Sequence, residues 1–103
     1  MWIYVLEQPI TGNDVAINYC SLDDSKLANY AKTNNINGNV NGRFPFFDIT
    51  GKTVIYSVVV DKNGNWVDVG QYFETQADAN LFVRNYSSTY KSPNVKVVTI
   101  TVL

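Results

Sequence analysis

Two stretches of the chain repeat the same order of local signals, and this repetition constrains the fold more than any other feature. Each stretch has an extended apolar run, a Gly/Asn turn, a second extended run and a hydroxyl residue that opens a helix. The four extended runs are 2–8, 14–20, 53–60 and 65–73, and the turns are 11–13 and 61–64. The helices are expected to begin at Ser21 and Thr75, each followed three positions later by Asp, as at a helix N-cap.

The repeated order predicts an α+β fold with an antiparallel or mixed sheet of about five strands, mainly antiparallel, in the order ββαββαβ. The two helices are expected to pack on one face of the sheet. With 103 residues, 46% of them hydrophobic, residues 1–103 form a single domain with one core. Its parts are a hairpin and helix at 1–33, an Asn-rich and aromatic loop at 34–52, and a hairpin, helix and strand at 53–103.

The individual elements differ in how strongly the sequence signals them. Asn63-Gly64 supplies the positive φ of a tight hairpin turn. In the second helix, Ala79, Phe82, Val83, Tyr86 and Tyr90 recur at helical spacing and are expected to face the sheet. The first helix, about 22–33, has a thinner apolar stripe, and the last strand is expected at 95–103.

Two of the expected strands are apolar on both faces, namely the first strand and residues 54–60. Two helices on one face of a sheet leave the opposite face bare, and such a face needs cover. We therefore expect the Asn-rich loop, a second copy of the chain or a partner protein to cover it. A homodimer is one of these alternatives.

The long loop ends in an aromatic segment, Arg43-Phe44-Pro45-Phe46-Phe47-Asp48-Ile49. Its rings could cover a sheet edge or plug the core, or they could be exposed as anchors for a protein partner. The sequence leaves both alternatives open. The candidate protein-binding residues are those of the loop together with two aromatic residues of the second hairpin: Arg43, Phe44, Phe46, Phe47, Trp66 and Tyr72.

The residue inventory excludes most catalytic and cofactor chemistry. The chain has no histidine and one cysteine, Cys20, so His-dependent catalysis and the usual zinc sites are excluded within one subunit. We expect Cys20 to be a small buried hydrophobic residue. No phosphate-binding glycine motif occurs, and the calcium-like start at Asp61 has Trp66 in place of the required Gly. We expect neither enzyme activity nor a cofactor.

Charge and hydropathy bear on partners and location. The formal net charge is −1 and 17% of residues are charged, which gives no broad field for nucleic acid or a lipid surface. No apolar run approaches the ~18 residues needed to span a bilayer. The N-terminal residues lack the pattern of an export signal, which predicts a cytoplasmic protein without nucleic-acid or membrane partners.

No motif is specific enough to assign the chain to a family. In format it is similar to many small phage or mobile-element proteins that act by binding a host protein. The leading hypothesis is a non-enzymatic protein-binding module that uses the 43–49 segment and an apolar sheet face. An inhibitor of a host enzyme or defence complex is one form of this hypothesis. The alternatives are an oligomeric protein that binds or sequesters a small ligand, and a structural assembly subunit.

Overall fold

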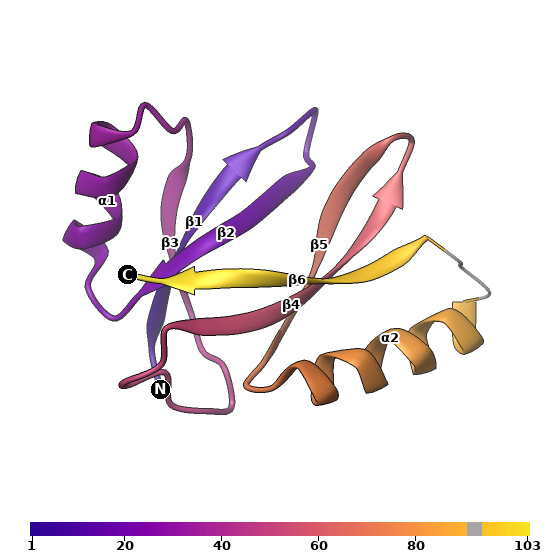
Figure 1. The fold of residues 1–103 in the computed structure, drawn as a ribbon. Coiled ribbons are helices and arrows are strands. Elements are labelled where there is room, and N and C mark those ends of the chain that lie inside the picture. Colours follow the sequence, from indigo (N-terminus) through magenta and orange to yellow (C-terminus); the bar gives the residue numbers. More distant parts are fainter. Residues whose placement is uncertain (91–93) are drawn as a thin grey trace.

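Six strands form one curled, mixed sheet that carries two helices (Figure 1). The computed structural model describes residues 1–90 and 94–103. The strands are β1 (Ile3–Pro9), β2 (Val15–Ser21), β3 (Asn39–Arg43), β4 (Val54–Lys62), β5 (Asn65–Phe73) and β6 (Val95–Val102); the helices are α1 (Asp24–Thr33) and α2 (Gln76–Tyr90). The order across the sheet is β3-β1-β2-β6-β4-β5, and only the β2–β6 pair is parallel among the described pairs.

One strand, β3, was not predicted. Residues 34–52 were expected to form a loop, but β3 lies within them, and the sheet has six strands rather than about five. β3 pairs with β1 along its length as an edge strand. Its sequence, Asn-Val-Asn-Gly-Arg, has one apolar side chain and low strand propensity, so no local signal marks it. An edge strand needs few buried side chains. Among the residues of β3, only Val40 packs against the buried cluster of Leu6, Leu27 and Ala31 beside α1.

The two helix starts gave different outcomes. Thr75 accepts a hydrogen bond from the backbone N–H of Asp78 through its hydroxyl oxygen, at 3.2 Å, as an N-cap does. The expected cap at Ser21 is wrong, because α1 begins at Asp24 with Asp23 as its N-cap. The Asp23 carboxylate accepts from the N–H of Ser25 at 3.0 Å. Ser21 instead ends β2, where it is buried and its hydroxyl donates to the Leu103 carbonyl at 3.2 Å.

The second hairpin has the predicted turn. Asn63 and Gly64 both have positive φ, 55° and 88°, and the Asp61 carboxylate accepts from the Gly64 N–H at 2.9 Å. The side chain of Asp61 is therefore used by the turn itself, as its sequence context indicated.

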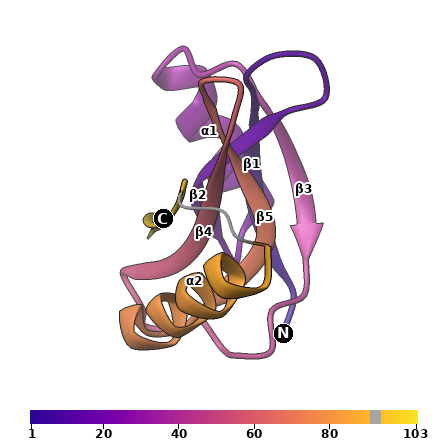
Figure 2. The same ribbon diagram turned by 90° about the vertical axis from the view of Figure 1, so that its right-hand side faces the viewer.

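The two helices lie at opposite ends of the sheet (Figures 1 and 2). The strand register places the residues that pack against them on the same face. The parallel β2–β6 pair shows that the two ends share a face. Tyr19, which packs in the cluster under α1, lies opposite Thr101. Thr101 is on the same side of β6 as Val95 and Val97, which pack in the cluster under α2. α1 covers the β3-β1-β2 end through Leu27 and Ala31. α2 covers the β6-β4-β5 end through Ala79 and the predicted stripe as far as Tyr86, whereas Tyr90 is exposed.

The opposite face of the sheet is covered mainly by the sheet itself. The curl brings apolar residues of the two ends together in one buried cluster: Ile3, Val5, Ile17, Cys20, Ile49, Ile55 and Ile100. Phe47 of the aromatic segment packs against this cluster, and Ile49 belongs to it. The two-sided strands are thus accounted for within one chain, and their burial requires neither a second copy nor a partner.

Cys20 is fully buried in this cluster, as expected of a small hydrophobic residue. Burial raises the pKa of its thiol to about 12, so the thiolate is not formed near neutral pH.

Candidate protein-binding site

The segment 43–49 alternates between side chains that enter the core and side chains that leave it. Ile49 is buried and Phe47 is half-buried against the main cluster. Phe44 is 58% exposed and Phe46 is fully exposed, at 104% of its reference area. The rings of one segment therefore have different environments: Phe47 covers the core, while Phe44 and Phe46 are exposed to solvent.

Other exposed apolar side chains extend this surface. Trp2 is 63% exposed and contacts Phe44 edge to face, with ring centroids 5.7 Å apart. Leu81 of α2 is 51% exposed and lies with Phe46 around one hollow. We call Trp2, Phe44, Phe46 and Leu81 the aromatic patch. Single exposed apolar residues are ordinary, but a contiguous group of large ones is typical of an interaction surface.

Phe46 stands at the junction of three hollows of the surface. The largest, which we call the α2 groove, has a volume of ≈ 460 Å³. It lies between the aromatic segment, the end of β5 and the first turns of α2, and is lined by Phe46, Phe47, Tyr72, Phe73, Glu74, Asp78, Leu81, Phe82 and Asn85. The other two hollows measure ≈ 380 and ≈ 180 Å³. A projecting ring beside an apolar groove is an arrangement suited to protein recognition.

Arg43 is held at the edge of the sheet rather than free in solvent. Its guanidinium forms an ion pair with Glu7 of β1 and donates to the carbonyl of Gly42 at 2.8 Å. It also lines the smallest hollow next to Phe46. Arg43 therefore fixes the position where the chain leaves β3 and enters the aromatic segment.

Tyr72 lines two of the hollows beside Phe46 and is half-buried against the main cluster. Burial, with a smaller contribution from the Asp68 carboxylate, raises the pKa of its hydroxyl to about 12. Arg43 opposes this shift, yet no described residue makes a hydrogen bond to the buried hydroxyl with normal geometry. Burial also raises the pKa of Asp68, whose carboxylate accepts from the Ser57 hydroxyl at 3.3 Å and from the Gly70 N–H.

Trp66 is not part of this surface. It lies at the start of β5, opposite Asp61, whereas Tyr72 is near the other end of that strand. The Lys96 ammonium lies 4.2 Å from the centroid of the Trp66 ring, a cation–π contact between β5 and β6. The structure thus brings together five of the six predicted residues and places Trp66 apart.

Trp2 and Leu81 were missed by the sequence analysis. Trp2 was assigned to the first strand, but β1 begins at Ile3. Leu81 lies outside the apolar stripe of α2, and a large apolar residue off the stripe was the one available signal.

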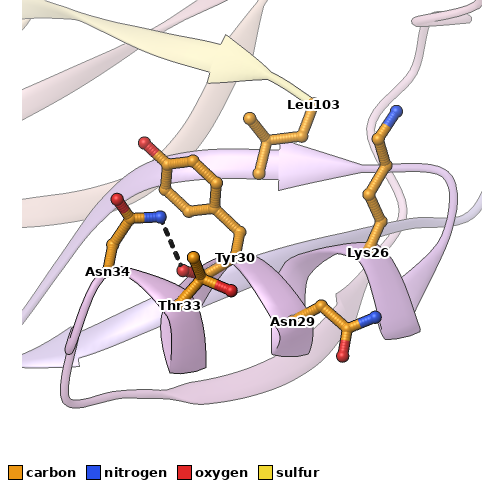
Figure 3. A pocket seen from close by; sticks show the side chains of 6 residues that line it. All are labelled: Lys26, Asn29, Tyr30, Thr33, Asn34 and Leu103. Atoms are coloured by element: carbon orange, nitrogen blue, oxygen red, sulfur yellow. Dashed lines mark hydrogen bonds between the residues drawn. The ribbon is translucent and has the colours of Figure 1, made fainter.

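A separate hollow of ≈ 490 Å³ lies over α1 (Figure 3). Tyr30 and Leu103 provide its apolar surface, and Lys26, Asn29, Thr33 and Asn34 complete the lining. The Asn34 side-chain amide donates to the Tyr30 carbonyl at 2.8 Å. No sequence pattern indicated a site here, because Leu103 meets α1 only through the tertiary fold.

Residues 1–90 and 94–103 contain no group of three or more His, Cys, Asp or Glu side chains arranged to hold a metal ion. Within the same residues, no helix has both the length and the apolar character to cross a membrane. Comparisons of the chain with protein-family models, with curated proteins and with solved structures found no match.

Proposed function

We propose that this chain is a non-enzymatic protein-binding module that uses the aromatic patch to bind a host protein. The observation that carries the proposal is the full exposure of Phe46 beside the α2 groove. Large aromatic side chains dominate the energy of many protein interfaces when a partner desolvates them. An inhibitor of a host enzyme or defence complex would act in this way, by covering the active site or a functional interface of its target.

The segment is also held in a way that favours binding. Phe47 and Ile49 anchor it to the core, and the Arg43–Glu7 ion pair fixes its start. Little backbone freedom is then lost when Phe44 and Phe46 meet a partner. Preorganisation of this kind increases affinity because it lowers the entropy cost of binding.

Affinity capture from a lysate of host cells, with three forms of the chain, tests the proposal. We expect wild type and Leu22→Ser to retain the same protein, and Phe44→Ser/Phe46→Ser to lose it. Leu22 is a matched control because it is 45% exposed and lies outside the patch, before α1. Retention of the same protein by the double variant would contradict the proposal.

A second candidate function is the binding of a small ligand in the hollow over α1. Its volume of ≈ 490 Å³ and its aromatic and amide lining are typical of small-ligand sites. A metabolite that raises the melting temperature of wild type but not of Tyr30→Ala would support this function. If no metabolite does so while Phe46-dependent capture succeeds, protein binding is the better account.

A further inference from the structure

The charges around the α2 groove indicate what kind of partner it fits. Its described lining contains two carboxylates, Glu74 and Asp78, and no cationic side chain. Lys52 lies outside the lining and forms an ion pair with Glu74 at 2.8 Å. Within the described residues, Asp78 forms no ion pair. The lining is therefore mostly apolar and contains two carboxylates, of which Glu74 is paired with Lys52 and Asp78 is not paired by any described cation.

A third carboxylate, that of Asp48, lies beside the exposed Phe46 ring. Asp48 and Phe46 line the same hollow, and hydrogen bonds from Thr50 hold the pKa of the Asp48 carboxyl below its ordinary value. The positive N-terminal amino group and Lys52 contribute further to this lowering. Asp48 is thus charged at neutral pH.

These charges argue against a second copy of the chain as the occupant. If Phe46 of each copy entered the groove of the other, Asp48 would approach the Asp78 carboxylate of the opposing copy, which no described cation pairs. Like charges brought together at an interface oppose association and act against the wrong partner. A cationic partner has the complementary charge.

We propose that the α2 groove and Phe46 bind a cationic, amphipathic segment of the partner protein. An apolar side chain of that segment enters the groove over Phe47 and Phe82, and a neighbouring Lys or Arg faces Asp78. An Arg of the segment can in addition stack on the exposed Phe46 ring. This inference rests on the proposed protein-binding function and adds the chemistry of the partner.

The test is a selection of random displayed peptides on the immobilised full chain, with removal of peptides that also bind Phe46→Ser. We expect the surviving peptides to combine an apolar residue with nearby Lys or Arg. Synthetic copies should bind wild type and Leu22→Ser, and their affinity should fall as salt is raised. Asp78→Asn should weaken binding about twofold to fivefold, the range for an exposed charge pair.

Asp24→Asn is the matched control for Asp78→Asn, because both residues are exposed acids in the first turn of a helix. It should leave peptide binding unchanged. Thermal unfolding of both variants shows whether the loss of a helix-start carboxylate has disturbed the fold. Light scattering on wild type and Phe46→Ser measures self-association.

Each contrary result has a separate meaning. Phe46-dependent peptides without an excess of Lys and Arg, or with equal affinity for Asp78→Asn, would overturn the partner chemistry and leave the protein-binding function standing. A selection that yields no Phe46-dependent peptide would count against both. A wild-type dimer that Phe46→Ser dissociates would overturn the inference, since the groove would then be occupied by a second copy.

Discussion

Phe46 and Ile49 lie three residues apart, yet the structure gives them opposite environments. Ile49 is 1% exposed within the main cluster, whereas Phe46 is fully exposed. We predict that Phe46→Ser changes the free energy of unfolding by less than about 0.5 kcal/mol, as at other surface positions. Ile49→Ala should cost about 2–5 kcal/mol, because it leaves a cavity. Urea denaturation of both variants measures the difference, and a large loss in Phe46→Ser would rule out the exposed anchor.

Tyr72 provides a second prediction at the residue scale. Because its buried hydroxyl has no hydrogen-bond partner among the described residues, Tyr72→Phe should raise the free energy of unfolding by about 1 kcal/mol at neutral pH. A comparable decrease would mean that the hydroxyl is hydrogen-bonded in solution. Tyr90→Phe, at a 67% exposed tyrosine, is the control and should have little effect.

The raised pKa of Tyr72 also predicts how stability depends on pH. The folded state keeps the hydroxyl proton up to about pH 12, whereas the unfolded chain releases it near its ordinary pKa of about 10. Ionisation of Tyr72 therefore leaves the free energy of unfolding unchanged below about pH 10 and lowers it as pH rises towards 12. Unfolding measured across this range should show a smaller alkaline loss in Tyr72→Phe than in wild type. The Cys20 thiol contributes in the same direction and remains in the variant.

At the scale of elements, β3 depends on the close approach of the chain to β1. A Cβ atom at Gly38, directly before β3, would lie 2.6 Å from the Glu7 carbonyl oxygen. Gly38→Ala should therefore displace β3 and lower the free energy of unfolding by about 1–3 kcal/mol, as other overpacked positions do. Asn37→Ala, at the exposed neighbouring residue, should have little effect. Unchanged stability and unchanged hydrogen exchange in β3 of Gly38→Ala would contradict this account.

The sequence predicted those elements whose signals are local. The Asn63-Gly64 turn, the Thr75 cap and the apolar stripe from Ala79 to Tyr86 depend on neighbouring residues, and the structure contains all three. β3 has almost no local signal, because its pairing with β1 determines its conformation. Within the candidate site, the exposed rings at Phe44 and Phe46 were one of two alternatives. Leu81 joins them only through tertiary packing, which sequence spacing does not report.

At the scale of the whole molecule, the curl of the sheet makes the two pseudo-repeated halves share one core. Ile3 and Val5 of β1 lie in the same buried cluster as Ile55 of β4 and Ile100 of β6. The parallel β2–β6 pair also joins the halves by backbone hydrogen bonds. Each helix covers a cluster at its own end of the sheet, but both halves bury further residues in the shared cluster, so we expect them to unfold together as one cooperative unit.

The two tryptophans allow this cooperativity to be measured, because Trp2 precedes β1 in the first half and Trp66 lies in β5 of the second. In Trp66→Phe the fluorescence reports on Trp2, and in Trp2→Phe it reports on Trp66. We predict that in each variant the fluorescence and far-ultraviolet circular dichroism transitions in urea coincide, since neither half can lose the shared cluster alone. If the Trp2 signal changed at lower urea than the circular dichroism of the same variant, the β3-β1-β2 end would unfold first. The shared cluster would then be too weak to couple the halves, and the aromatic patch, which spans both, would form only in the complete fold.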